Sequence, residues 1–360
     1  MASVRRDTRV ILLSYPGDPE SDLFNASARD NCCQPFLMLR AELAKRGFVI
    51  EQVSDQPLRQ CACIVYWNVN NLRLSGGLRG VARRLRSDTR GAARDLISEA
   101  RRQGLTERLA LVLWEPPSVC PENWDLKTHD HFPRILTWND ELVDGVRYHK
   151  FRPPVPSSFP VVPARPFESK KLLTMIAMNK VSSYPSELYS ARERSITYFE
   201  THHPADFDLY GIGWDDSPQV PSGTGSTRSG HRASQRHPSY REPVANKWNV
   251  FPIYRFALCY ENVFDQSGWV TEKLFDCMRA DCVPVYWGAP NVDEYVDSRA
   301  YIDRRRFQSD SELASYLAGM SEARYEEYRT AVRQYLQSEA FHLFESPAFV
   351  VSMLRGLGLC

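Results

Sequence analysis

The stretch that decides the fold is ENVFDQSGWVTEKLFDCMRADCVPVYWG, residues 261–288. An apolar run, RFALCY, leads into it, and a second apolar run, CVPVYWG, ends it. The segment between them, TEKLFDCMRA, carries its apolar residues at helical spacing, so the pattern predicts strand, loop, helix and strand in succession. The strands of such a unit are parallel, and open parallel sheets bind ligands beyond the carboxyl ends of their strands. The loop that follows the first run is therefore a candidate ligand site.

The polar residues of this loop suit a nucleotide sugar. Thr271 is the expected N-cap of the helix, where free amides and the helix dipole favour an anion, and Lys273 adds a cation in the first turn. Glu272 can hold sugar hydroxyls, Asn262 can bind a base or a sugar, and Trp269 offers a face for stacking. An ordinary helix start explains the same Thr-Glu-Lys, because a helix dipole also favours Glu272. Neither GxxxxGK[ST] nor GxGxxG is present, which argues against NTPase and classical dinucleotide sites.

Strands and helices alternate on both sides of this stretch. The apolar runs that predict strands outside it lie at 9–16, 61–69, 108–117, 171–179 and 207–214. The expected helices include 78–104, 185–202 and 310–338. The proline-rich segment 151–170 is an extended connector between two halves. The sequence therefore predicts an α/β protein of two Rossmann-like domains, 1–160 and 161–345, whose parallel sheets face an interdomain cleft. The apolar tail, 346–360, is expected to be a last helix that packs back on the N-terminal domain.

Composition excludes several classes of function. The 360 residues are 43% hydrophobic and 25% charged with a net charge of +1, so no global field favours nucleic acid or an anionic membrane. No apolar run approaches the roughly 18 residues of a transmembrane segment, and the first run is too short for a signal peptide. A cytoplasmic protein is expected, with peripheral membrane contact through the tail as the alternative. The nine scattered cysteines indicate reduced thiols, and no ligand spacing predicts a metal site.

Several separated blocks resemble one known family. YRFALCYEN, WVTEKLFDCMRADCVPVYWGAPNVDEYV and AYIDRRRF resemble, in order, the signature of glycosyltransferase family 10, the α1,3/4-fucosyltransferases. NKVSSYPSELYSARERSITYF, DLYGIGW and LWEPPSVCPENW are similar to its upstream segments, so the likeness covers roughly residues 108–308. The resemblance, to a bacterial-type soluble member, implies a GT-B fold and GDP-fucose as donor. It also implies inversion at the anomeric carbon, no cofactor and no metal.

The resemblance also assigns residues of the donor site. Lys273 and an arginine of SARER, Arg192 or Arg194, would hold the diphosphate, and Arg192 is preferred. Glu272 would take fucose hydroxyls, and Asn262 matches the asparagine of the donor loop. The chain departs from the pattern in two places: Trp269 stands where the family has tyrosine, and the loop before Thr271 is a residue longer than in some relatives.

Glu115, in LWEPP, matches the carboxylate that is proposed as the general base of the family. It follows an apolar strand at its carboxyl end, so we expect it to enter the cleft from the acceptor side. The alternative is a carboxylate that merely caps the exit of the strand. Neighbouring Trp114, Pro116 and Pro117 would desolvate the carboxyl and raise its pKa.

The expected function is inverting transfer of L-fucose from GDP-fucose to a hydroxyl of an acceptor glycan. Lipid-linked glycan and cell-surface polysaccharide are the candidate acceptors. Two alternatives stay open: the same fold and reaction with another nucleotide sugar, and an inactive protein that binds a sugar nucleotide. The joint presence of Glu115, Glu272 and Lys273 argues against the inactive protein, which has no need of all three.

Overall fold

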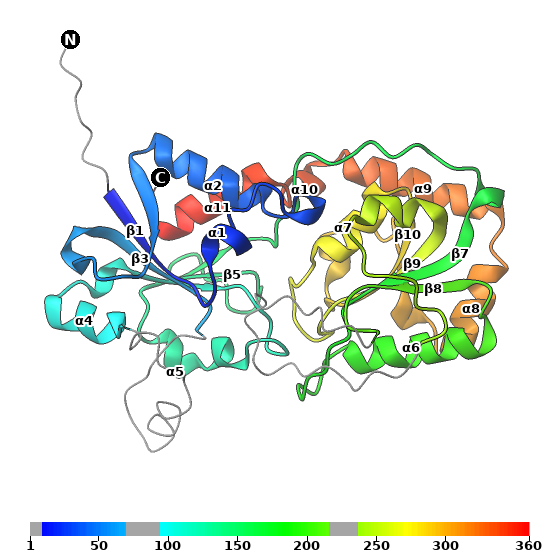
Figure 1. Ribbon diagram of the computed structural model, residues 1–360, viewed down its shortest axis with the longest axis horizontal. Helices are drawn as coiled ribbons and strands as arrows, with labels where there is room; N and C mark the ends of the chain where they lie inside the picture. Colours follow the sequence, from blue (N-terminus) through cyan, green and yellow to red (C-terminus); the bar gives the residue numbers. More distant parts are fainter. Residues whose placement is uncertain (1–8, 70–93, 216–236, 360) are drawn as a thin grey trace, which may run out of the picture.

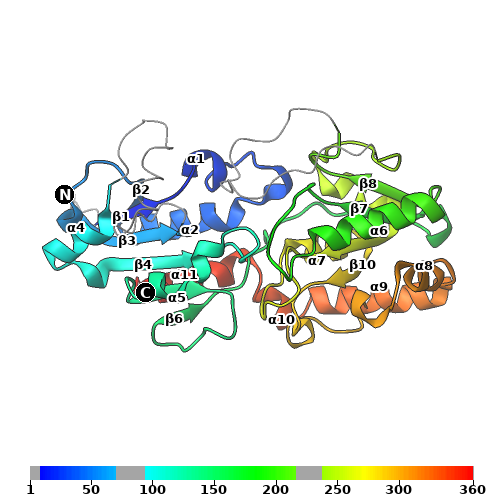
Figure 2. The ribbon, with the colours of Figure 1, turned by 90° about the horizontal axis from the view of Figure 1, so that it is seen from below.

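Two parallel sheets organise the chain, of which the computed structural model describes residues 9–69, 94–215 and 237–359. Each sheet forms its own α/β domain, and the two domains appear as separate lobes in Figure 1 and in the view from below in Figure 2. None of the helices in the described ranges has the length and apolarity needed to span a bilayer.

The N-terminal sheet has the strand order β2-β1-β3-β4-β5-β6, and all its pairs are parallel. Its strands are β1 (Arg9–Ser14), β2 (Phe48–Gln52), β3 (Cys61–Trp67), β4 (Leu109–Leu113), β5 (Arg134–Thr137) and β6 (Tyr148–Lys150). β4 is buried along its whole length, as its uninterrupted apolar sequence LALVL requires in a sheet covered on both faces. The helices are α1 (Pro19–Asp22), α2 (Gln34–Lys45), α4 (Leu96–Gln103) and α5 (Leu126–His129). Most of the helix expected over 78–104 lies outside the described residues, and α4 covers its last part.

The C-terminal sheet has the order β11-β10-β9-β7-β8 and is also parallel. Its strands are β7 (Lys171–Ile176), β8 (Phe207–Tyr210), β9 (Tyr254–Tyr260), β10 (Val283–Trp287) and β11 (Ile302–Asp303). In chain order, the second strand of each sheet (β2 or β8) lies on one side of the first (β1 or β7), and the third (β3 or β9) lies on the other side. Strand order therefore reverses between β1 and β3 and between β7 and β9, and doubly wound sheets bind ligands at such points.

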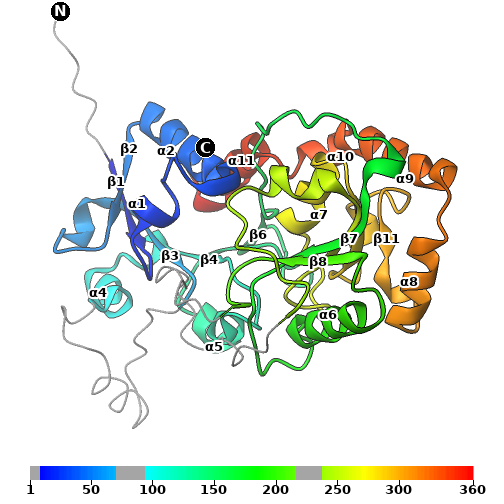
Figure 3. The same cartoon turned by 45° about the vertical axis from the view of Figure 1, so that its right-hand side comes forward.

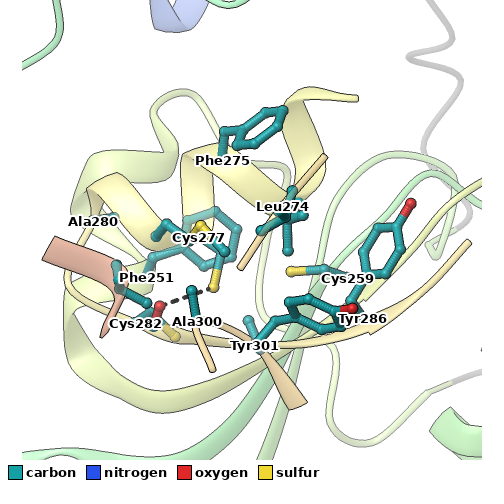
Figure 4. Packing of buried hydrophobic residues seen from close by; sticks show 14 of the residues in the cluster. Phe251, Cys259, Leu274, Phe275, Cys277, Ala280, Cys282, Tyr286, Ala300 and Tyr301 are labelled. Atoms are coloured by element: carbon teal, nitrogen blue, oxygen red, sulfur yellow. Dashed lines mark hydrogen bonds between the residues drawn. The ribbon is translucent and has the colours of Figure 1, made fainter. Parts of the chain in front are cut away.

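Helix α7 (Glu272–Arg279) packs its apolar face against this sheet. Leu274 points from α7 toward Cys259 of β9 and Tyr286 of β10, and Sγ of Cys277 donates to the carbonyl of Cys282 at 3.3 Å (Figure 4). On its outer side Phe275 contacts Phe344, with ring centroids 4.6 Å apart. This two-sided burial fixes the start of α7 at the carboxyl ends of the strands. The other helices here are α6 (Tyr189–His202), α8 (Asp310–Ala318), α9 (Glu322–Leu336) and α10 (Glu339–His342).

The chain ends by crossing back to the N-terminal domain. Helix α11 (Ser346–Leu357) lies beside α2, as Figures 1 and 3 show, and Phe349 and Met353 join the N-terminal core. A Cβ on Gly356 would lie 2.7 Å from Cδ2 of Leu136, so only glycine allows this approach of α11 to β5. The last helix thereby ties the two domains together.

Two details differ from the sequence prediction. The single helix expected over 310–338 is two helices, because Ser321 caps a new start and its hydroxyl accepts from the amide of Arg324. Strands β5 and β6 were not predicted. Every described cysteine is free, and Cys32 alone among them is exposed.

Candidate active site

A cavity of about 540 Å³ lies between the two domains. Its N-terminal wall is formed where β1, β3 and β4 end, and includes Tyr15, Asn68 and Glu115. Its opposite wall comes from the C-terminal domain and includes Lys180 and Glu272. The cavity thus lies at the reversal point of the N-terminal sheet and faces the start of α7.

A second cavity, of about 220 Å³, lies at the carboxyl ends of β7 and β9. The residues that line both cavities are Arg29, Lys180, Lys247 and Glu272, so the two cavities adjoin. Among the described residues, the second cavity is lined by five basic side chains and one acidic side chain, Glu272. The basic ones are Arg29, Lys180, Arg192, Lys247 and Lys273. We call this second cavity the basic cavity. Its excess of positive charge is suited to a ligand that carries several negative charges.

The start of α7 is held by a buried carboxylate. Glu261 is 0% exposed and accepts hydrogen bonds from the amide and the hydroxyl of Thr271, both at 2.9 Å. Nζ of Lys273 lies 3.1 Å from Oε2 of the same carboxylate. Thr271 occupies the predicted N-cap position, but its hydroxyl donates to Glu261 and makes no capping bond. We therefore correct the predicted role: Thr271 anchors the loop to β9.

The charges at this helix start affect one another. Burial lowers the pKa of Lys273, but Glu261 and Glu272 outweigh that effect, so the pKa lies above its ordinary value. Burial also raises the pKa of Glu272, but the positive charges of Lys273 and Lys247 outweigh it and lower the pKa to about 2. Both groups are therefore charged near neutral pH. The side chain of Glu272 is 44% exposed and can reach a ligand in either cavity.

Arg192 and Arg194, two residues apart on α6, lie on different sides of the helix. Arg192 is buried and lines the second cavity, where its Nη2 donates to the carbonyls of Tyr260 and Glu261 at 2.7 and 2.8 Å. The same nitrogen donates to Oδ1 of Asn262 at 3.2 Å. Arg194 is exposed. The structure therefore brings Arg192, Asn262 and Lys273 to one cavity and leaves Arg194 outside it.

Glu115 follows β4 and faces the interdomain cavity, where it is partly exposed. Burial raises the pKa of its carboxyl, and the positive charges of Lys180 and Lys273 act in the opposite direction without cancelling the rise. A carboxylate with a raised pKa is a stronger base than an ordinary one. Its position matches the prediction from the sequence, and its role as base stays a prediction.

Asn68 and Asn123 hold the backbone of Glu115. Oδ1 of Asn68 accepts from the amides of Trp114 and Glu115 at 2.9 and 3.0 Å, and from Nδ2 of Asn123 at 2.7 Å. The carbonyl of Glu115 accepts from Nδ2 of Asn123 and from Nε1 of Trp124, both at 3.2 Å. Asn68 has φ 63°, a left-handed conformation that is uncommon outside glycine and clusters at functional sites. The backbone of Trp114 and Glu115, which follows β4, is therefore held rigidly.

The prediction that Trp269 stacks on the donor is wrong. Its side chain is 6% exposed and packs in the N-terminal core, with its ring centroid 4.5 Å from that of Trp138. Trp269 lines neither cavity within the described residues. The apolar ring belongs to the contact between the domains, because Trp138 follows β5 of the other sheet.

Sequence reasoning missed three residues of the site: Lys180, Asn68 and Asn123. Lys180 follows β7 as Glu115 follows β4. The rule that ligands bind beyond the carboxyl ends of parallel strands, which led to Glu115, could therefore also have led to Lys180. The sequence has no comparable signal for the two asparagines, because they act on a backbone segment far away along the chain.

Comparison with known proteins places this site in a family. A model described as "Glycosyltransferase family 10 (fucosyltransferase) C-term" matches residues 180–349, which include Arg192, Asn262, Glu272 and Lys273. An α-(1,4)-fucosyltransferase of Arabidopsis thaliana is 40% identical over 77 residues, which are 21% of this chain and 19% of that protein. The α-(1,3)-fucosyltransferase FucT of Helicobacter pylori is 32% identical over 74 residues, 21% of this chain and 15% of that protein. Each match thus spans less than a fifth of the relative's own length.

The fold has a solved counterpart. A crystal structure of an α1,3-fucosyltransferase superposes with a TM-score of 0.51 at 13% identity and covers 99% of this chain and 92% of that chain. At this identity the likeness concerns the fold alone, which is GT-B: two domains with parallel sheets on either side of a cleft. The resemblance to glycosyltransferase family 10 is thus confirmed over residues 180–349, which match the C-terminal model of that family.

Proposed function

We propose that this protein transfers L-fucose from GDP-fucose to a hydroxyl of an acceptor glycan, with inversion at the anomeric carbon and without a metal ion. One observation carries the proposal: Glu115 lines the interdomain cavity, which adjoins the basic cavity of Arg192 and Lys273. The family match supports the donor, because fucosyltransferases give the family its description.

The donor diphosphate belongs in the second cavity. Lys273, in the first turn of α7, and Arg192, on α6, supply two cations there, and the helix dipole favours the same charge. Glu272 would accept hydrogen bonds from fucose hydroxyls at the junction of the two cavities. Asn262, beside Arg192, would contact the donor through its amide. Trp269 has no part in this proposal.

In the reaction Glu115 takes the proton of the acceptor hydroxyl as the oxygen attacks the anomeric carbon of fucose. The bond from that carbon to the β-phosphate oxygen breaks on the opposite face, and GDP leaves with the bonding electron pair. Attack opposite the leaving group inverts the configuration. General-base catalysis of this kind contributes typically 10²–10⁴-fold to the rate.

Departure of GDP adds one negative charge to the diphosphate. Lys273, Arg192 and the start of α7 are already in position to stabilise that charge before the bond breaks. Because the buried Glu261 fixes Lys273, little reorganisation is needed during the reaction. This preorganised set would do what a divalent ion does in other transferases.

A donor panel tests the proposal. Calorimetry with GDP-fucose, GDP-mannose and UDP-galactose, each with and without EDTA, should show preference for GDP-fucose and no effect of EDTA. Transfer to glycan acceptors with free hydroxyls, followed by linkage analysis, should give a fucosylated product of inverted configuration. Preference for another nucleotide sugar would leave the reaction type in place and replace the donor. Binding without turnover of any donor would favour an inactive binding protein.

The acceptor is proposed as a glycan, either lipid-linked or part of a cell-surface polysaccharide, and α1,3 or α1,4 linkages follow from the names of the relatives. The first cavity, on the N-terminal side of the cleft, is the proposed acceptor site. Its lining includes Tyr15 and Trp114, whose rings can contact sugar faces. Competition between soluble and lipid-linked acceptors in one reaction would distinguish the two classes.

A further inference from the structure

Lys180 lines every one of the three cavities described in the cleft. It follows β7 and lines both the interdomain cavity and the basic cavity. It also lines a small third cavity of about 90 Å³, which it shares with Arg192. Lys180 is partly buried, and neither the proposed reaction nor any of the motifs quoted above gives it a role.

Its neighbours among the basic residues are already paired. Lys273 binds Glu261 at 3.1 Å, Lys247 binds Asp276 at 2.6 Å, and the buried Arg192 donates to backbone carbonyls. Lys180, in contrast, has no hydrogen bond or ion pair with any residue in the described ranges.

An ammonium without a partner in a partly buried place is unfavourable. Burial lowers the pKa of Lys180, and Arg192 and Lys273 lower it further, while Glu115 raises it. An anionic ligand in the basic cavity would supply the missing partner. The unpaired cation therefore points to a ligand with more negative charge than Lys273 and Arg192 together neutralise.

Lys180 and Glu115, the proposed base, both line the interdomain cavity. Of the two cations that lower the pKa of Glu115, Lys180 has the larger effect, although the two residues form no ion pair. Lys180 is therefore placed between the site of the leaving group and the group that activates the acceptor.

We propose that Lys180 is a third cation for the diphosphate of the donor, and that its engagement by the diphosphate frees Glu115 to act as base. The proposal rests on the proposed function, since it needs a nucleotide diphosphate in the basic cavity. Without donor the charge of Lys180 acts on Glu115 and weakens it as a base. With donor bound, the phosphate oxygens attract the ammonium, so Glu115 becomes more basic only when a donor is present.

The first test is GDP binding to the full chain. Lys180→Met keeps the length of the side chain and removes its charge, so we expect GDP to bind about tenfold more weakly by calorimetry, as for a lost charged hydrogen bond. Lys180→Arg should keep most of the affinity. Lys127→Met, at an exposed lysine of the other domain, is the matched control and should bind GDP as the wild type does. Unchanged GDP affinity in Lys180→Met would overturn the diphosphate contact.

The second test separates coupling from mere binding. In the free enzyme, loss of the Lys180 charge raises the pKa of Glu115. The acid limb of the pH profile, where the rate falls because Glu115 becomes protonated, should therefore move to higher pH for kcat/KM of the donor. The acid limb of kcat should stay, because the diphosphate already holds the ammonium in the wild-type complex. Equal movement of both limbs, or of neither, would overturn the coupling. If the wild-type protein binds no GDP, the proposed function itself is wrong. The Tm of Lys180→Met is the control for folding, and an unchanged Tm excludes a folding defect.

Discussion

Lys273 is ion-paired at 3.1 Å with Glu261, a carboxylate that is 0% exposed. The same carboxylate accepts two hydrogen bonds from Thr271, so β9 and the start of α7 are joined through one side chain. Loss of one partner from a buried pair leaves an uncompensated charge, which is strongly destabilising. Glu261 therefore positions the cation that we assign to the diphosphate.

Glu261→Gln is expected to lower the free energy of unfolding by about 2–4 kcal/mol, because Lys273 loses its partner and Thr271 loses an ionised acceptor. Urea denaturation measures this change. Glu107→Gln is the control: its side chain is 62% exposed, and its loss should change stability by no more than about 0.5 kcal/mol. If the Glu261 and Glu107 variants lose the same stability, the buried pair has no special importance.

Arg192 and Arg194 provide a matched pair of substitutions on one helix. Arg192→Ala removes a cation from the basic cavity and three hydrogen bonds, so we expect GDP affinity to fall at least about tenfold. Arg194→Ala, at an exposed position, should leave both GDP affinity and Tm near those of the wild type. Calorimetry with GDP compares them, and weaker binding in the Arg194 variant alone would reverse the assignment.

Glu115 should determine the acid limb of the rate profile. Burial raises its pKa, so the carboxylate becomes protonated, and the rate falls, at a higher pH than for an ordinary glutamate. Glu115→Gln should lower kcat about 10²–10⁴-fold and remove that limb. Its affinity for GDP should stay nearly that of the wild type. Initial rates of transfer between pH 4 and 9 measure both effects, and turnover at the wild-type rate in the variant would exclude Glu115 as the base.

The sequence was sufficient to predict the two sheets where strands are continuous apolar runs, such as β4 and β9. It did not predict β5, whose apolar run is only Ile135 and Leu136, or β6, whose sequence YHK contains no apolar run and is only partly buried. The break between α8 and α9 was missed for a related reason: apolar spacing continues across it, and only the cap at Ser321 marks the new start.

Part of the site could be predicted because its residues are close in sequence. Asn262, Glu272 and Lys273 lie within one loop and helix start, so local rules apply to all of them. Asn68 could not be found in this way, since its side chain contacts the amide of Glu115, 47 residues later. Trp269 shows the same limit, because a sequence reveals an apolar ring but not the partner that covers it.

Trp269→Phe tests the corrected role of this ring. Because Trp269 packs on Trp138 in the contact between the domains, the smaller ring should lower the free energy of unfolding by about 1–3 kcal/mol. Affinity for GDP-fucose should change less than twofold, since the ring lines neither cavity within the described residues. Thermal unfolding and calorimetry on the same preparation separate the effects. A large loss of donor affinity at unchanged Tm would restore the stacking role.

Asn68 is expected to affect the rate through Glu115 without touching the donor. Asn68→Gly tolerates the left-handed φ of 63° but removes the acceptor that holds the amides of Trp114 and Glu115. We expect kcat to fall at least about tenfold while the KM for GDP-fucose stays nearly constant, because the base becomes less well positioned.

Asn68→Asp gives the complementary result. Its carboxylate still accepts the three hydrogen bonds that Oδ1 of Asn68 accepts now, so the position of Glu115 is kept. The added negative charge should raise the pKa of Glu115, and the acid limb of kcat should move to higher pH while the rate at high pH recovers. If the Gly and Asp variants lost activity equally at every pH, hydrogen bonding to the strand exit would not be what positions the base.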